Sequence, residues 1–148
     1  MTRDEYVRQV DRVLEAHRVS AKAQLIAALA LIPAEAKRLS FDIFVDQDGE
    51  GFLDVRVGLD GPGLYGLNRA IAQHAELFGT RMTGDGLDPA LPLMSPGEEA
   101  FSVHDALTDC AAAWVVSLWN QIDHRGINLP VDVVSHDGYG TTTPIGLK

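Results

Sequence analysis

The sequence predicts an α+β fold in one domain, residues 1–148, and three observations lead to this prediction. Apolar side chains recur at helical spacing near the N-terminus, alternate with period two over residues 41–59, and form a long helical stretch over residues 103–124. We therefore expect an N-terminal helical hairpin and a small sheet led by an antiparallel β-hairpin. Two further helices would pack against this sheet, the last one (about 103–124) centrally.

The N-terminal segment contains signals for two helices. Thr2 and Glu5 have the spacing of a capping box, which predicts a helix from there to about Arg18. Ser20 can cap a second helix before Pro33 interrupts it. The apolar face of this second helix consists of Leu25, Ile26, Leu29 and Ile32.

Residues 41–59 predict a β-hairpin, because two alternating runs flank the turn-forming segment 47–51. The side chains expected to face the helices are Ile43, Val45, Leu53, Val55 and Val57. Those expected on the other face are Asp42, Asp46, Asp54 and Arg56. Phe44 shares the face of Asp42, so we expect it to be partly covered or to serve an interface.

The rest of the chain is predicted from turn residues and from spacing. Leu64, Leu67, Ile71, Ala75 and Phe78 have the spacing of one helix face. Glycine and proline predict a long irregular loop over 79–101, with a short strand at 91–94. Ser102 can cap the fourth helix, residues 129–134 can form a last strand, and residues 136–144 are expected to be irregular and exposed.

Composition and charge limit the classes of partner. The net charge is −9; residues 1–38 hold seven Lys and Arg against five Asp and Glu, whereas residues 39–148 hold five against sixteen. Acidic surfaces repel nucleic acid and anionic lipid, so we expect neither nucleic acid nor a membrane as partner. The single cysteine, Cys110, excludes an internal disulfide and is expected to be a buried, inert thiol. With no secretory signal and no membrane-spanning segment apparent, a cytoplasmic protein is predicted.

Several motifs approach a functional pattern without completing it. Gly61-Pro-Gly-Leu-Tyr-Gly66 matches a dinucleotide-binding fingerprint, but no second parallel strand ends in an acidic residue about 20 positions later. Residues 46–57 imitate a calcium loop, but Val57 stands where a bidentate glutamate is needed. The pair His136-Asp137 could orient a base, but no activated serine or cysteine accompanies it. The motifs therefore predict no catalytic residue, no cofactor and no tightly bound metal.

Residues 41–54, 61–71 and 114–119 together resemble small acidic bacterial proteins, among them the immunity proteins of polymorphic toxin systems. This resemblance implies a non-enzymatic protein-binding module that inhibits a basic toxin, and it implies no catalytic residues. The acidic side chains expected to contact the basic partner are Asp46, Asp48, Glu50, Asp85, Asp88, Glu98 and Glu99.

Two alternatives stay open. One is a small metal- or ligand-dependent enzyme built on His104, Asp105 and the 79–101 loop. The further metal ligands of such an enzyme would come from His74, His124 or Asp109. The other alternative is a structural homodimer. A concave pocket in which titratable groups converge would favour the enzyme, whereas a flat or convex acidic face would favour the binding module.

Overall fold

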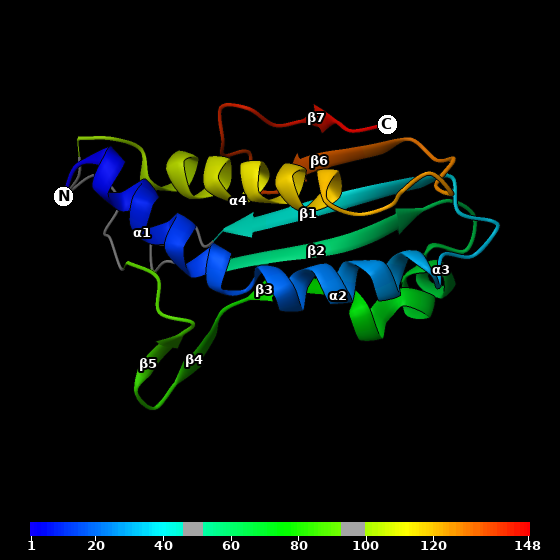
Figure 1. The fold of residues 1–148 in the computed structure, drawn as a ribbon, viewed down its shortest axis with the longest axis horizontal. Helices are drawn as coiled ribbons and strands as arrows, with labels where there is room; N and C mark the ends of the chain where they lie inside the picture. Colours follow the sequence, from blue (N-terminus) through cyan, green and yellow to red (C-terminus); the bar gives the residue numbers. More distant parts are fainter. Residues whose placement is uncertain (46–51, 93–99) are drawn as a thin grey trace.

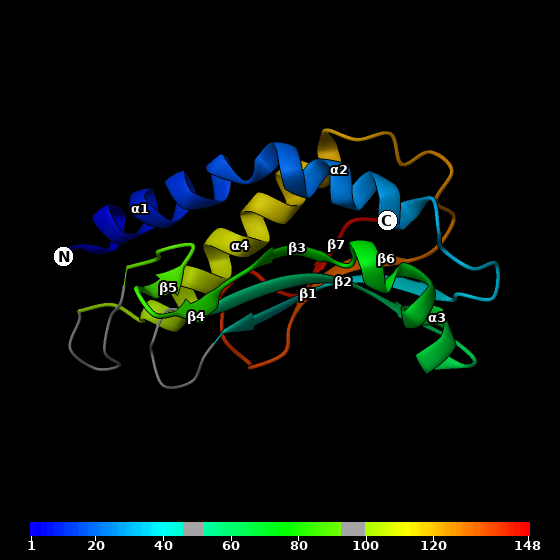
Figure 2. The same cartoon turned by 90° about the horizontal axis from the view of Figure 1, so that it is seen from below.

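A computed structural model describes residues 1–45, 52–92 and 100–148 and confirms the α+β class. A mixed five-stranded sheet in the order β3-β2-β1-β6-β7 carries helices α1, α2 and α4 on one face (Figures 1 and 2). The helices are α1 (Arg3–Ala16), α2 (Arg18–Leu29), α3 (Leu64–Ile71), the 3₁₀ turn η1 (Ala72–His74) and α4 (Val103–Asn120). The strands are β1 (Arg38–Val45), β2 (Leu53–Asp60), β3 (Glu76–Gly79), β4 (Arg81–Thr83), β5 (Gly86–Asp88), β6 (Val131–Ser135) and β7 (Ile145–Gly146).

Both N-terminal helices are present, but α2 begins at Arg18, ahead of the expected cap Ser20, and the two helices follow one another end to end instead of folding back as a hairpin (Figures 1 and 2). The predicted capping box is present, with the Glu5 N–H 3.1 Å from Thr2 Oγ1 and the Thr2 N–H 3.0 Å from Glu5 Oε2. Only His17 separates α1 from α2, and its backbone (φ −100°, ψ 0°) bends the chain without reversing it. A reversal needs more turn residues than this one position supplies.

The predicted β1–β2 hairpin is confirmed in pairing and in orientation. Its strands are antiparallel, with Ile43 opposite Val55 and Asp42 opposite Arg56. The inward set is buried, namely Phe41, Ile43, Val45, Leu53, Val55 and Val57, and the described outward residues are half-buried. The expected turn between the strands, 47–51, and the expected outward residue Asp46 lie outside the described residues.

Helix α4 is central, as predicted, although it ends at Asn120. It packs against β1, β6 and α1, and Ser102 caps it by accepting the Asp105 N–H at 3.2 Å. Trp119 is only 1% exposed and meets the Phe41 ring edge-on, with ring centroids 5.9 Å apart. An aromatic pair in this geometry fixes the helix on the sheet.

The region between α3 and α4 departs most from the prediction. The expected helix over 64–78 ends early, and Phe78 lies in β3, where it pairs with Val55 of β2. Leu77 and Phe78 are both buried, so burial at the edge of the sheet outweighs their helical spacing. The expected irregular loop contains a two-stranded hairpin, β4–β5. The expected short strand is not formed at Leu91 and Pro92, and its other two residues lie outside the described part.

The C-terminal strand β6 pairs in parallel with β1, and β7 then pairs antiparallel with β6. The segment 136–144 between them is irregular, as predicted, and is fastened to α4. The Gly140 N–H donates to Asp105 at 2.8 Å, and the Thr141 N–H donates to Asp109 at 2.7 Å. Burial alone would raise the pKa of Asp109, but the hydrogen bonds from Thr141 and Thr142 outweigh it and hold that pKa below its ordinary value.

Candidate functional site

The two faces of the five-stranded sheet differ in cover. In Figure 2, α1, α2 and α4 lie on one side of the sheet, whereas α3 lies at its far end, beside the end of β2. The face turned away from α1, α2 and α4, here the uncovered face, carries polar and aromatic side chains of β1 and β2. Its members on these two strands include Ser40, Asp42, Phe44, Asp54, Arg56 and Gly58.

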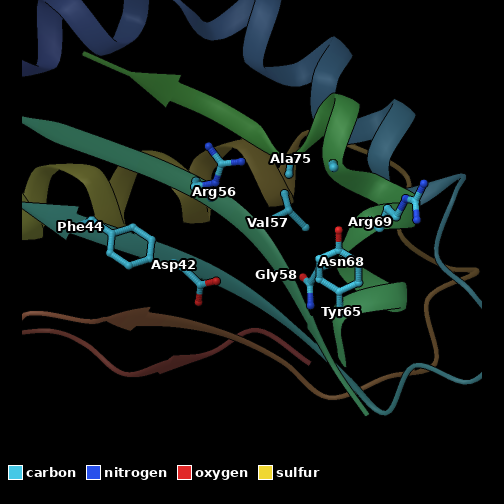
Figure 3. Close-up of a pocket in the computed structure, with 10 residues that line it drawn as sticks. Asp42, Phe44, Arg56, Val57, Gly58, Tyr65, Asn68, Arg69 and Ala75 are labelled. Carbon is cyan, nitrogen blue, oxygen red and sulfur yellow. The ribbon is translucent and has the colours of Figure 1, made fainter. Parts of the chain in front are cut away.

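A pocket of about 390 Å³ lies between the uncovered face and α3 (Figure 3). Its size falls within the range of small-molecule sites. We call it the α3 pocket; its walls are Asp42, Phe44, Arg56, Val57, Gly58, Tyr65, Asn68, Arg69, Ala72 and Ala75. A concave site with titratable groups therefore exists, but on other residues than those expected from the sequence.

The floor of the α3 pocket depends on the absence of a side chain at Gly58. A Cβ atom there would lie 2.4 Å from Asp42 Oδ2 and 3.1 Å from Ser40 Oγ. Asp42 Oδ1 lies 3.0 Å from His136 Nε2, and the His136 ring stacks on Phe44 with centroids 4.6 Å apart. His136 thus pairs with Asp42 of β1, and its sequence neighbour Asp137 instead accepts the Val45 N–H at 2.8 Å.

The wall formed by α3 is attached to β2 through one side chain. Asn68 Oδ1 accepts the Leu59 N–H, and Asn68 Nδ2 donates to the carbonyl oxygens of Leu59 and Leu64, each at 2.9 Å. Gly61 (φ 146°) and Gly63 (φ 70°) adopt positive φ angles in the preceding turn, which explains these two glycines. Both strands that pair with β2 are antiparallel to it, so the fingerprint-like glycines form a turn and a helix start instead of a nucleotide-binding βαβ unit.

The charged groups of the α3 pocket are unequally paired. Arg56 Nη1 lies 3.8 Å from Glu76 Oε1, but the same oxygen is 2.6 Å from Arg81 Nη2. Beside them, burial and then the charge of Glu76 raise the pKa of Asp54. The side chain of Arg69 is exposed and makes no hydrogen bond or ion pair with any residue that the structure describes. The α3 side of the pocket therefore offers a guanidinium group available to a ligand.

The residues of the expected enzyme site are held in separate structural contacts. His104 is buried and stacks on Tyr139 with ring centroids 4.4 Å apart, and Asp105 and Asp109 bind the segment 136–144. His74 contacts Gln24, and His124 stacks on Trp119. Within residues 1–45, 52–92 and 100–148, no three His, Cys, Asp or Glu side chains are grouped closely enough to bind a metal ion.

Two of the seven acidic residues expected at a partner interface lie on the β4–β5 hairpin, residues 81–88, here called the arm. Asp85 and Asp88 are both exposed, and the arm extends away from the five-stranded sheet (Figure 1). Met82 is 58% exposed, whereas Leu87 is buried against the body. The remaining five acids, Asp46, Asp48, Glu50, Glu98 and Glu99, lie outside the described residues.

The single cysteine is buried, as predicted. Cys110 lies within α4, and burial, followed by the nearby charge of Asp11, raises the pKa of its thiol to about 12. At neutral pH it is therefore a protonated thiol and a poor nucleophile.

The chain belongs to DUF6389, a family of unknown function, because the model of this family matches residues 1–148. Searches of the curated proteins and of the solved structures find no match to this chain. In the described part of the chain, no helix combines the length and the apolar character that crossing a membrane requires.

Proposed function

We propose that this member of the DUF6389 family is a protein-binding module whose arm contacts the basic surface of another protein. The observation that carries the proposal is the arm itself, which extends from the body with Asp85 and Asp88 exposed. In the described residues these carboxylates have no ion-pair partner. A basic surface would supply the missing counter-charges.

The arm is attached to the rest of the molecule by the ion pairs of Arg81 with Asp54 and Glu76 and by the buried Leu87. It does not join the five-stranded sheet, and a two-stranded hairpin by itself is marginally stable in water. Leu87 anchors it, while Met82, which pairs with Leu87 across the hairpin, exposes a large apolar side chain. An arm that carries both an apolar thioether and carboxylates suits the long side chains of Lys and Arg, whose stems are apolar and whose heads are charged.

The resemblance to immunity proteins adds the class of partner to this proposal. A toxin that acts on nucleic acid or on another anionic target carries basic surface, which an acidic arm can cover. Under this proposal the partner is such a toxin, encoded next to the gene of this chain.

The test is the rate of association with the protein encoded by the neighbouring gene, or with any protein that co-purifies with the chain from its own cells. Asp85→Lys and Asp88→Lys should each slow association several-fold at low salt, with a smaller effect at high salt. Glu35→Lys is the matched control, because it makes the same charge change in the segment between α2 and β1, at the other end of the molecule.

Equal association rates for the two arm variants and the Glu35→Lys control would show that the arm is not the contact. A chain that binds no protein in either experiment would contradict the proposal as a whole.

A further inference from the structure

We infer that the α3 pocket binds a small organic anion, a flat ring that carries a carboxylate or phosphate group. This inference concerns the α3 pocket and not the exposed acids of the arm, and it does not rest on the proposed function. The proposed partner contact uses the arm, and no residue of the arm lines this pocket.

The shape of the pocket indicates a ligand and not a packing defect. Its volume of about 390 Å³ is far larger than one water molecule needs. Gly58 keeps its floor clear, because any side chain there would collide with Asp42. Asn68 lines the pocket, but its amide is fully engaged with backbone groups, so the wall is held in place without a ligand.

The arginine side chains that line the α3 pocket favour an anionic ligand. Arg69 has no partner among the described residues, and Arg56 has only a 3.8 Å contact with a carboxylate that Arg81 holds more closely. Asp42, the acidic group in the wall, is already paired with His136. A guanidinium group matches a carboxylate or phosphate with two parallel hydrogen bonds, which is the interaction that Arg69 lacks.

The aromatic side chains that line the α3 pocket favour a ligand with a planar ring. Tyr65 is 80% exposed at the mouth of the pocket, and its labelled ring stands beside Asn68 and Gly58 in Figure 3. Phe44 closes the other end, with one ring face already taken by His136. Tyrosine and phenylalanine rings pack favourably against planar rings in offset-stacked or edge-to-face arrangements.

A cationic ligand is the main competitor, because Asp42 and the two rings could together hold an ammonium or amidinium group. The guanidinium groups of Arg56 and Arg69, which also line the pocket, oppose it. Benzoate and benzamidine therefore make a matched pair of probes, since they share a ring and differ in the sign of their charge. Adenosine monophosphate tests the phosphate form of the same chemistry.

The experiment is a titration of the ¹⁵N-labelled full chain, followed by amide chemical shifts. We expect benzoate or adenosine monophosphate to shift the amide signals of Gly58, Tyr65 and Arg69, with a dissociation constant on the order of 1 mM for such small probes. Arg69→Ala should weaken this binding roughly tenfold, the loss of one charge-assisted contact. Arg8→Ala on α1 should leave it unchanged, because Arg8 is also exposed but belongs to a helix on the covered side of the sheet.

Three results would overturn the inference: tighter binding of benzamidine than of both anions, equal binding by the Arg69→Ala and Arg8→Ala variants, or no shift in the pocket with either anion at about 10 mM. Should Arg69→Ala fail to fold, Arg69→Lys keeps the charge without the paired donors and should still weaken binding measurably.

Discussion

Each face of strand β1 carries a phenylalanine, and the two rings have different surroundings. Phe41 on the covered face is fully buried and meets Trp119 of α4, whereas Phe44 on the uncovered face is half-buried and stacks on His136. The first position is defined by the close packing of many apolar neighbours. The second depends on one residue that the chain brings from beyond β6. The alternating apolar pattern of the sequence thus determines the covered face, whereas the uncovered face depends on single contacts such as the stacking of His136 on Phe44.

The largest expected effect separates these two phenylalanines. Phe41→Ala should lower the free energy of unfolding by about 3–5 kcal/mol, because it leaves a cavity against Trp119. Phe44→Ala should cost about 1 kcal/mol, since water already reaches that ring. Urea denaturation of both variants measures the difference, and equal losses would show that the uncovered face is packed as tightly as the core.

Gly58 provides a sharper test of the uncovered face. Gly58→Ala should destabilise the protein by about 1–2 kcal/mol, because its Cβ atom would displace the Asp42 carboxylate. In an Asp42→Ala background the same change should become neutral or stabilise by about 0.5 kcal/mol, as alanine is less flexible than glycine in the unfolded chain. A double-mutant cycle in urea gives the coupling; simple additivity would mean that Asp42 does not restrict position 58.

The segment 136–144 links the two sides of the molecule, and its attachment to Asp109 should depend on pH. The folded state lowers the pKa of Asp109, so its ionised form adds stability above the ordinary pKa, and this contribution is lost as the pH falls through the lowered value. Asp109→Asn should therefore cost about 1 kcal/mol at neutral pH and progressively less below about pH 4.

Thermal unfolding of the Asp109→Asn variant across this pH range measures the effect. Asp85→Asn on the arm is the control, because Asp85 has no hydrogen-bond donor to its carboxylate among the described residues. A constant cost of Asp109→Asn at all pH values would contradict the role given to its charge.

The smallest effect on stability is expected from a cysteine substitution that allows the α3 pocket to be compared with the buried helix α4 by thiol labelling. Ala72→Cys places a thiol on an exposed position of the α3 pocket and should hardly change the unfolding midpoint. With iodoacetamide at pH 8 we expect this cysteine to react quickly, and Cys110 to react only when the protein unfolds, because its thiol is buried and its pKa is about 12. Mass spectrometry of the native variant distinguishes the sites, and rapid labelling of Cys110 would show that α4 opens easily.

The features that sequence predicted best are those with a repeating local pattern. The capping box at Thr2, the alternation over 41–59 and the apolar stretch of α4 all depend on neighbours within a few residues of one another. The helix expected over 64–78 shows the limit of this reasoning, since Phe78 fits helical spacing and yet is buried as part of β3. The spacing of apolar residues could not show that one edge of β2 was open for pairing with the strand that contains Phe78.

The α3 pocket was not predicted, and its residues explain why. Asp42 and His136 meet only because β6 runs parallel to β1, and Gly58 acquires its role only opposite Ser40 and Asp42. Tyr65 and Arg69 stand in a short helix and match no motif, so their spacing alone did not indicate a site. The expected acidic interface was inferred from charge excess, and the structure describes only its part on the arm.

The parallel pairing of β1 with β6 also determines how this chain is completed during synthesis. The ribosome releases β1 and β2 early, but one edge of β1 stays unpaired until residues 131–135 emerge after α4. An unpaired strand edge is a template for other chains, so the nascent protein passes through a stage at which aggregation competes with folding. Chaperone binding should therefore concentrate on chains stalled before Val131, and release should follow once the final strands enter the sheet.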